Sequence, residues 1–559
     1  MKTVAVFPGE AFDRLRRCWD GLAALESVQF RAADDVRDPC SDALIAVNVP
    51  LSVAEEATAA GKRTFAFVSA KPMLGALAGE PVQFTRSSFL DPILRGRRLQ
   101  DSSVPLNCPW VMLVTEPLAA KGDTPVWSRV RFQGEAADLV AYPAPECVES
   151  PYLFPHCRSG AFMRLLPLIH FLREVNGGAA WRRPPVRACF MLDDPNLHWG
   201  SFGFVRYRRL VASARKHNYH VAFATVPLDA WFVHQPTAKL FRENADRVSL
   251  LIHGNDHTRE ELARPRSAER CLQIAAQALR RTETLEKCCG FGVARVMAAP
   301  HGSCHAEMAA AMLRVGFEAA CISRGSIMYS NPAEQWPATV GLTPAEFLGG
   351  GLPTIPRFAL TDKCHTEVIL AVFLGQAIIL VGHHQDLNDN HRTLETLAGF
   401  INDLPGARWT NLEAIARSNY WLSTADDVLR IRTYSRRWDL SVPEGVRHIV
   451  IEPAWQRESG RPDRVQVGRE GQATPLTLDG DRYSMDAQGS RALWVSHLAE
   501  RHEDHRTVAA PPVTLWPLVR RLLSEGRDRL QPWLSSRSDA RASSGGPSGK
   551  GSGVLDRTT

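Results

Sequence analysis

Apolar residues recur along the chain with two periods, one typical of strands and one typical of helices. In about the first 180 residues, short apolar runs alternate with stretches whose apolar positions follow helical spacing. This alternation predicts a parallel β-sheet with crossover helices. The predicted strands are 3–7, 43–49 and 64–69, and the predicted helices are 12–25 and 52–61.

The end of this first unit is also marked in the pattern. Residues 163–172 are apolar at helical spacing and predict a packing helix, which Pro167 would kink. The Gly- and Pro-rich stretch 176–185 predicts a linker. Because the segment after the first strand lacks a GxGxxG pattern, we expect no dinucleotide site. The interpretation is an N-terminal α/β domain, flavodoxin-like, over residues 1–178.

The same alternation resumes over residues 186–425. It is typical of a β/α barrel or a related wound sheet, in which catalytic side chains gather at the carboxyl ends of the strands. The predicted strands are 188–192, 220–225, 248–252, 293–298, 318–322 and 377–381, and the predicted helices are 205–217, 268–286, 306–315 and 392–402.

Beyond residue 429 the helical period disappears. Short strand-like segments separated by Pro, Gly and Asp predict a small β-sandwich over residues 429–500. A helical segment, 505–534, is expected next, with a proline-interrupted helix over 513–534. The Ser-, Gly- and Arg-rich tail 535–559 is expected to be disordered, because it cannot bury enough apolar surface to offset the entropy lost on ordering.

Charge and cysteine content narrow the class of protein. The formal charge is +6, and residues 506–559 contribute nine Lys/Arg against four Asp/Glu, so the other 505 residues carry about +1. A folded body this close to neutral argues against nucleic-acid binding. The twelve cysteines lack paired spacing, which indicates free thiols in a reducing compartment. The start of the chain is too short for a signal-peptide core, and the apolar stretch 368–382 falls short of the ~18 residues of a membrane span. We therefore expect a cytoplasmic protein without a membrane span.

Histidines and acids concentrate where four of the predicted strands end. In a barrel these ends converge on one pocket, so the four segments are expected to form one site. Ionisable groups that close an apolar run are costly to bury unless they are paired or bind a metal. The segments are FMLDDPNLH (190–198), SLLIHGNDH (249–257), VMAAPHGSCH (296–305) and IILVGHHQD (378–386).

The order of these motifs resembles that of the polysaccharide deacetylase superfamily, the NodB-like carbohydrate esterases of family 4, with this chain as a divergent member. The shared features are paired aspartates, an HxxxH pair, a Pro-Gly loop and a late histidine after an apolar strand, and they cover residues 186 to about 420. The resemblance implies a central distorted (β/α) barrel. It also implies a metal-dependent hydrolase that removes acyl groups from an N- or O-acylated saccharide.

The resemblance assigns roles residue by residue. It makes Asp193 the general base, and a late histidine, His383 or His384, the acid that protonates the leaving group. The metal ligands would be Asp194, His253 and His257, and this donor set with an open position suits Zn²⁺. The backbone N–H beside Pro300, in the loop that includes His301, would help to hold the oxyanion. Asn196 and His198 are candidate substrate contacts.

The chain departs from the family pattern at three points. The arginine that would orient the base is missing before Pro300, so that Arg295 or Arg357 would have to replace it. The family's fourth motif, with its Asp and Trp, has no clear match between residues 322 and 377. The late strand carries two adjacent histidines, which leaves the choice of acid open.

Two other functions remain compatible with these motifs. One is hydrolysis of a non-sugar amide on the same scaffold, and the other is a catalytically silent, metal-containing saccharide-binding protein. His301 and His305 also have metal-pair spacing, although loop hydrogen bonding is the commoner role for such residues. Trp199 and Trp231 are more often core or rim aromatics than sugar platforms.

Overall fold

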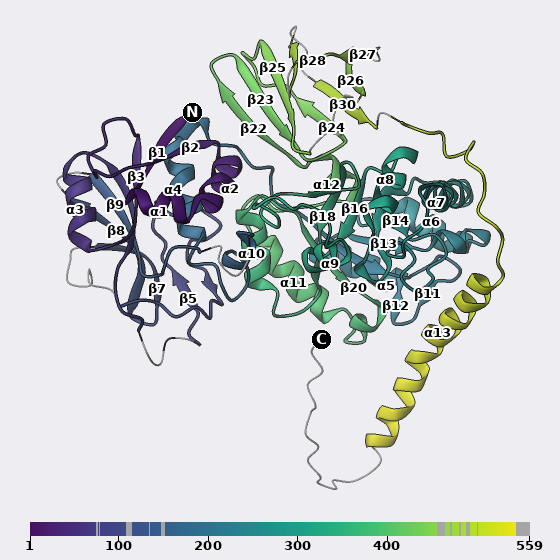
Figure 1. The fold of residues 1–559 in the computed structure, drawn as a ribbon. Coiled ribbons are helices and arrows are strands. Elements are labelled where there is room, and N and C mark those ends of the chain that lie inside the picture. The colour runs from purple at the N-terminus through teal and green to yellow at the C-terminus, as the bar shows by residue number, and fades with distance from the viewer. Residues whose placement is uncertain are drawn as a thin grey trace.

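The computed structural model consists of an N-terminal α/β unit, a central barrel, a β-sandwich and a long C-terminal helix (Figure 1). A mixed α/β chain, as predicted, is confirmed. In the last helix, side chains are described as far as residue 532. The structure describes all residues except 74–76, 78, 108–114, 133–134, 147–150, 456–463, 470–471, 480–481, 488–491, 500 and 544–559.

The N-terminal sheet is parallel in one half and antiparallel in the other. Its order is β2-β1-β3-β4-β9-β8-β7-β5-β6, with parallel pairing from β2 to β9. The predicted strands 3–7, 43–49 and 64–69 correspond to β1, β3 and β4, whereas the antiparallel half was not predicted. The elements are β1 (Lys2–Phe7), α1 (Gly9–Arg14), α2 (Arg16–Glu26), β2 (Val28–Ala32), β3 (Ala43–Val49), α3 (Leu51–Ala59), β4 (Arg63–Val68), β5 (Val82–Phe84), β6 (Arg98–Leu99), β7 (Thr115–Lys121), β8 (Thr124–Phe132), β9 (Glu135–Val140), η1 (Phe154–His156), α4 (Leu166–Asn176) and η2 (Gly177–Ala179).

Helix α4 corrects the expectation of a kink at Pro167. The helix begins at Leu166, so Pro167 occupies its first turn. A first-turn proline costs no hydrogen bond, since those N–H groups lack helical acceptors in any case. The proline therefore starts this helix instead of bending it.

The central unit is built around a sheet in the order β17-β18-β16-β15-β14-β13-β10-β20-β19. Its strands from β18 to β19 are parallel, and the predicted strands and helices of this region are all present with small shifts at their ends. The elements are β10 (Arg187–Asp193), β11 (Ser201–Phe202), β12 (Val205–Arg206), α5 (Tyr207–His217), β13 (Val221–Thr225), η3 (Pro227–Trp231), α6 (Gln235–Glu243), β14 (Val248–His253), α7 (Ala268–Cys289), β15 (Ala294–Ala298), η4 (Pro300–Gly302), α8 (Ala306–Val315), β16 (Ala319–Ile322), α9 (Arg324–Ser330), β17 (Glu346–Leu348), β18 (Leu352–Pro356), β19 (Phe358–Ala359), α10 (His365–Phe373), β20 (Ile378–Gly382), η5 (His384–Leu387), α11 (Arg392–Asn402), β21 (Arg408–Trp409) and α12 (Leu412–Arg417).

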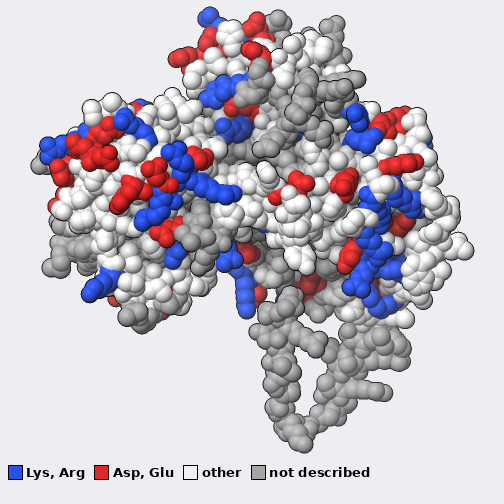
Figure 2. Space-filling model, in the orientation of Figure 1, with Lys and Arg blue, Asp and Glu red and all other residues white. Residues whose placement is uncertain are grey.

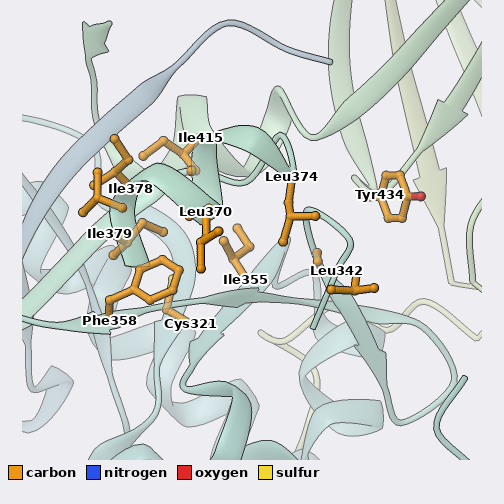
Figure 3. Packing of buried hydrophobic residues seen from close by; sticks show 14 of the residues in the cluster. Cys321, Leu342, Ile355, Phe358, Leu370, Leu374, Ile378, Ile379, Ile415 and Tyr434 are labelled. Carbon is orange, nitrogen blue, oxygen red and sulfur yellow. The ribbon is translucent and has the colours of Figure 1, made fainter. Parts of the chain in front are cut away.

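One short stretch of chain joins the two edges of this sheet. Strand β18 pairs with β16, and β19 pairs with β20 at the other edge, with Arg357 alone between β18 and β19. The sheet therefore curls round until a single segment closes it as a barrel. Figure 3 shows Ile355 and Phe358 of this segment packed near Leu370 of α10.

The β-sandwich has its own core, whereas the N-terminal unit and the barrel share one. Buried residues of those two units form a single apolar cluster, and the sandwich forms a second cluster around Trp438 and Tyr483. Its two sheets have the orders β22-β23-β25-β29-β28 and β24-β30-β26-β27. The strands are β22 (Tyr420–Ala425), β23 (Val428–Thr433), β24 (Arg437–Ser441), β25 (His448–Pro453), β26 (Arg464–Arg469), β27 (Gln472–Leu476), β28 (Leu478–Asp479), β29 (Arg482–Asp486) and β30 (Ala492–Leu498).

The last helix, α13 (Trp516–Ser543), extends beyond the expected end at residue 534 and contains Pro532. The segment 535–543, expected to be disordered, is therefore helical, and the rest of the expected tail lies outside the described residues. Helix α13 runs along the barrel on the side of α5, β11 and β12 (Figure 1). Among the described residues, no helix combines the length and apolar character that crossing a bilayer requires.

Candidate metal centre

The paired aspartates and the first motif histidine lie at the ends of two barrel strands. Strand β10 ends at Asp193 and β14 ends at His253, and β13 lies between them in the sheet. Because the three strands are parallel, these ends fall at the same rim of the barrel. The apolar runs before both residues are buried in the barrel core, which fixes their positions.

Asp194, His253 and His257 come together at this rim. Asp194 Oδ1 lies 3.7 Å from His253 Nε2 and 3.2 Å from His257 Nε2. Among the described residues, this trio is the one group of three His, Cys, Asp or Glu side chains whose donor atoms lie within 4.8 Å of one another. Around a tetrahedral ion with bonds of about 2.0–2.1 Å, ligand atoms are about 3.4 Å apart. The spacing therefore fits a single metal ion.

The state of the donor atoms also fits a metal. His253 Nδ1 is 2.9 Å from the carbonyl oxygen of Ala298, which can only accept, so Nδ1 carries the proton and Nε2 keeps its lone pair. Asp194 Oδ1 is buried and has no hydrogen-bond partner within the described part of the chain. A buried carboxylate oxygen without a partner is costly unless a cation fills the position.

Electrostatics at the trio favour the forms that bind metals. Burial alone would raise the pKa of Asp194, but the neighbouring His253, His257 and Arg521 lower it to about 2. Burial, with a smaller effect of His253, lowers the pKa of His257 to about 3. Asp194 is therefore ionised and His257 neutral at physiological pH, as metal ligands must be.

Two of the three candidate ligands have strained backbone conformations. Asp194 has φ 82° and His257 has φ 53°, in the left-handed region that residues other than glycine seldom adopt. Such strain persists where the surrounding structure enforces it, often at functional sites. In each case the strain lies in a loop just beyond a barrel strand.

Asp193, the first of the paired aspartates, is held by an arginine. Asp193 is buried, and its Oδ2 accepts a hydrogen bond of 3.0 Å from Arg357 Nη1. Arg357 Nη2 donates to the carbonyl of Ala299 at 3.2 Å. Of the two candidates for the missing orienting arginine, Arg357 thus takes the place beside Asp193, and Arg295 pairs with Glu286 at 2.8 Å. Asp193 Oδ1 is buried without a hydrogen-bond partner among the described residues.

The loop that carries His257 is held by Glu261, a residue the sequence analysis did not single out. The carboxylate of Glu261 accepts hydrogen bonds from the backbone N–H groups of Asn255, Asp256 and His257, at 2.8–3.0 Å. Gly254 permits this arrangement, because a Cβ there would lie 2.5 Å from Glu261 Oε2. An acid eight residues after His253, within a polar loop, is too common a pattern to be recognised from sequence.

The two late histidines lie in different surroundings. His383 is exposed, and its electrostatic interaction with Asp194 is one of the causes that lower the pKa of Asp194. His384 is buried against Phe202 and Phe204, with its Nε2 3.7 Å from Asp528 of α13. His383 is therefore the member of the pair that shares the electrostatic environment of the candidate ligands.

The Pro-Gly loop approaches the site from β15. Pro300 is buried, and the exposed His301, with φ 56°, has its ring 5.4 Å from that of His257. His305 instead lies 2.6 Å from Glu307 through Nδ1. His301 thus lies beside the candidate ligand His257, whereas His305 is paired with an acid.

Asn196 and His198, the candidate substrate contacts, are buried beneath α13. His198 Nδ1 lies 3.1 Å from Glu525 Oε2, and His198 Nε2 lies 3.0 Å from the carbonyl of Asp229. Burial opposes a charge on His198, but Glu525 and Asp229 raise its pKa. Asn196 Nδ2 donates to Glu525 as well, at 3.1 Å. Both candidates are therefore engaged by the protein itself in this conformation.

Helix α13 also reaches the ligands. Arg521 Nη2 donates to the backbone carbonyl of Asp194 at 2.8 Å and to Asp229 Oδ2 at 2.6 Å. Arg520 donates to the backbone carbonyl of His257. The polar residues of α13 were not linked to the site from sequence, because more than 250 positions separate them from the motifs they contact.

Two cavities flank the site. One of about 210 Å³ lies beside the His257 loop and is lined by Asp256, Thr258 and three arginines. The other, of about 220 Å³, reaches Arg357 from the side of the N-terminal unit. The arginines that line the first cavity are Arg266, Arg270 and Arg281.

Comparison with known proteins gives matches among solved structures. No protein-family model and no curated protein sequence matches the chain. A candidate polysaccharide deacetylase from Mycobacterium smegmatis matches with 13% identity and a TM-score of 0.30, over 43% of this chain and 91% of that one. The peptidoglycan deacetylase PdaC from Bacillus subtilis matches at 13% identity and a TM-score of 0.24, over 42% and 91%. A family 4 carbohydrate esterase from Streptomyces lividans, in complex with acetate, matches at 15% identity and 0.24, over 41% and 98%. At these values the matches carry no argument about function, which rests on the site.

Proposed function

We propose that this chain is a metal-dependent hydrolase that removes acyl groups, foremost acetyl, from an N- or O-acylated saccharide. The observation that carries the proposal is the side-by-side placement of a three-residue ligand set and a separate carboxylate. Asp194, His253 and His257 converge within 4.8 Å, and Asp193 is held next to them by Arg357. A purely structural metal site has no use for the second acid.

The ligand set favours Zn²⁺. Two imidazole nitrogens and one carboxylate oxygen, with a fourth position open, are typical of catalytic zinc. When bound there, the ion would polarise the acyl oxygen and lower the pKa of a water molecule. His253 Nε2, His257 Nε2 and Asp194 Oδ1 would hold it.

The residues around the ligands supply the proton transfers. Asp193 Oδ1, which has no hydrogen-bond partner in the described structure, would take a proton from the attacking water as the new carbon–oxygen bond forms. Arg357 keeps the other oxygen of Asp193 occupied, so that one oxygen is directed to the water. His383 would then give a proton to the departing amine or alcohol when the acyl bond breaks. The N–H of His301, next to Pro300, would help to hold the oxyanion.

A non-sugar amide is the second candidate substrate. The three arginines that line the cavity beside the His257 loop favour an acidic acyl compound over a neutral sugar, because guanidinium groups pair with carboxylates. Exposed aromatics, Trp199 and Trp231, are the features nearest to a sugar platform. The acetate-release assay described next distinguishes an acylated saccharide from a non-sugar amide as substrate.

The test combines metal content and product release. Purified protein is analysed for bound zinc and then incubated with N-acetylated oligosaccharides, and free acetate is measured. The proposal expects about one ion per chain and acetate release that stops when a chelator removes the ion. Bound metal without acetate release from any acylated saccharide would refute the saccharide hydrolase and direct the search to non-sugar amides.

A cytoplasmic location is part of the proposal. Nine cysteines in the described part of the chain, Cys18 set aside, carry free thiols, and free thiols in such number are typical of proteins kept in reducing compartments.

A further inference from the structure

Helix α13 presents its polar stripe to the barrel and its apolar side to solvent. Pro517, Arg521, Glu525 and Asp528 are the buried positions of its first half, and they follow helical spacing. A helix on the surface of a globular protein normally buries an apolar stripe and exposes a charged one. The arrangement in α13 is the reverse.

The outward side of this helix gathers most of the exposed large apolar side chains of the described chain. Of fourteen such residues, eight lie between positions 513 and 530, and three more lie in loops beside the helix. Trp516 is 64% exposed and Leu523 is 66% exposed. Contiguous apolar surface of this kind marks an interaction site. We call it the α13 face; its members are Val513, Leu515, Trp516, Leu518, Val519, Leu522, Leu523 and Leu530, with Trp199, Trp231 and Phe232.

The three loop residues are held against the helix. Trp231 lines a cavity of about 170 Å³ together with Leu518 and Leu522. Trp231 also contacts Phe232, with ring centroids 5.8 Å apart, and Arg529 lies 6.0 Å from the ring of Trp199. The loops and the helix thus form one surface.

Polar contacts on the inner side keep this face outward. Arg521 pairs with the buried Asp229 at 2.6 Å, and Glu525 contacts His198 and Asn196. Turning the helix to bury its leucines would leave Asp229 as a buried charge without its arginine partner, which is strongly unfavourable. The apolar face therefore cannot be hidden by a simple rotation.

We propose that the α13 face docks on the surface of a bilayer that contains anionic lipids. Amphipathic helices that bind such surfaces combine leucine and tryptophan on one side with arginine or lysine nearby. Residues 506–559 hold nine basic and four acidic residues, of which Arg521, Glu525 and Asp528 are buried against the barrel. The side chain of Arg527 is 74% exposed, and that of Arg259, in the neighbouring loop, is 82% exposed. Figure 2 shows basic side chains in a band on the side of the barrel that carries α13.

Charge favours an anionic lipid surface over a second copy of the chain as the partner of the α13 face. In a twofold dimer through the α13 face, each basic segment would meet the other, and like charges across an interface oppose association. An anionic lipid surface, by contrast, attracts basic residues that lie close to it. The charge of the segment therefore fits lipid and not self-association.

Flotation with lipid vesicles tests this docking. The full-length protein is mixed with vesicles of phosphatidylcholine alone or with about 30% phosphatidylglycerol, at low and high salt. We expect binding to the anionic vesicles that weakens with salt, and at least a tenfold loss of that binding in Leu522→Glu/Leu523→Glu. Both side chains are exposed, so the fold should survive, which thermal melting checks.

Tyr329→Glu is the matched control. Tyr329 is 88% exposed on α9, well away from α13, and its replacement should leave vesicle binding unchanged. Absence of binding by the unaltered chain, or equal binding by the double variant, would overturn the proposal. A concentration-dependent dimer that the double variant dissociates, without vesicle binding, would assign the face to a second copy instead. None of these results depends on hydrolase activity.

Discussion

Arg357 Nη1 lies 3.0 Å from Asp193 Oδ2 and couples the position of this carboxylate to the segment that closes the barrel. Because the guanidinium contacts Asp193 and the Ala299 carbonyl at once, a lysine cannot reproduce both contacts. We expect Arg357→Lys to lower turnover about 10- to 100-fold, in the range typical of residues that orient a metal site. Bound metal, measured in the same preparation, should stay at the wild-type level.

Arg295→Lys is the matched control for this substitution. Arg295 pairs with Glu286 on the outer side of the barrel and should not affect turnover. Equal activity of the two variants would show that Arg357 has no part in orienting the base.

Variants of a proposed ligand and of the proposed base should differ in metal binding. His253→Ala removes a buried donor and is expected to abolish stoichiometric metal binding, whereas Asp193→Asn keeps the metal and loses turnover. Metal analysis after gel filtration measures both variants. His305→Ala, which removes a histidine paired with Glu307, should retain the metal. Tight metal retention by His253→Ala would show that the ligand assignment is wrong.

Gly254 should be intolerant of a side chain. Its φ is 65°, and a Cβ would meet Glu261 Oε2 at 2.5 Å and Pro300 Cγ at 2.8 Å. Gly254→Ala is expected to lower the free energy of unfolding by about 1–3 kcal/mol and to weaken metal binding, because the displaced loop carries His257. Urea unfolding and metal titration measure the two effects. Gly200→Ala, where a Cβ meets nothing within 4 Å, should change neither quantity.

The contact of α13 with the barrel should depend on pH through His198 and Glu525. Burial opposes the charge of Glu525, but His198 and Arg529 lower its pKa to about 2. The stabilising contribution of Glu525 to the contact is therefore present above pH 4.5 and is lost as the pH falls towards 2. The pKa of His198 is raised above its ordinary value of 6.5. The stabilising contribution of His198 to the contact is therefore complete below pH 6.5 and is lost as the pH rises through the raised pKa. The contact is therefore strongest between these limits.

Hydrogen exchange of the α13 amides, corrected for the intrinsic effect of pH, measures this dependence. We expect protection to fall as the pH rises above the raised pKa of His198. In His198→Gln that fall should disappear, since the amide does not titrate. A pH-dependent loss of the same size in this variant would assign the effect to another group.

The sequence patterns predicted the strands that carry the motifs, because buried parallel strands are continuous apolar runs that few other structures produce. Strands β10 and β14 begin and end within one residue of the predicted bounds. The antiparallel half of the first sheet and strand β18 were not predicted. These strands are short or carry charged residues at alternate positions, and their pairing is set by tertiary contacts.

For the site, local motifs pointed to the three candidate ligands, and residues distant in sequence contact them. From the motif order we hypothesised that Asp194, His253 and His257 lie together, and in the structure they do. The choice between Arg295 and Arg357 could be made only from the closed barrel, in which Arg357 contacts Asp193. The roles of Arg521 and Glu525 could not be foreseen, since a polar stripe on a helix normally faces water. Residues that contact a site across long sequence separations leave no local signal.

Residues 352–359 form the segment that closes the barrel, and we call this segment the seam. Opening of the seam would affect the base and the candidate metal site differently. Asp194 and His257 lie in loops just beyond β10 and β14, whereas Arg357 is the residue at which the seam changes partner from β16 to β20. Loosening of the seam would release Asp193 while leaving the ion-binding trio intact. A preparation that binds a full complement of metal but has no activity would then indicate that the barrel has opened at the seam, and not that the metal is missing.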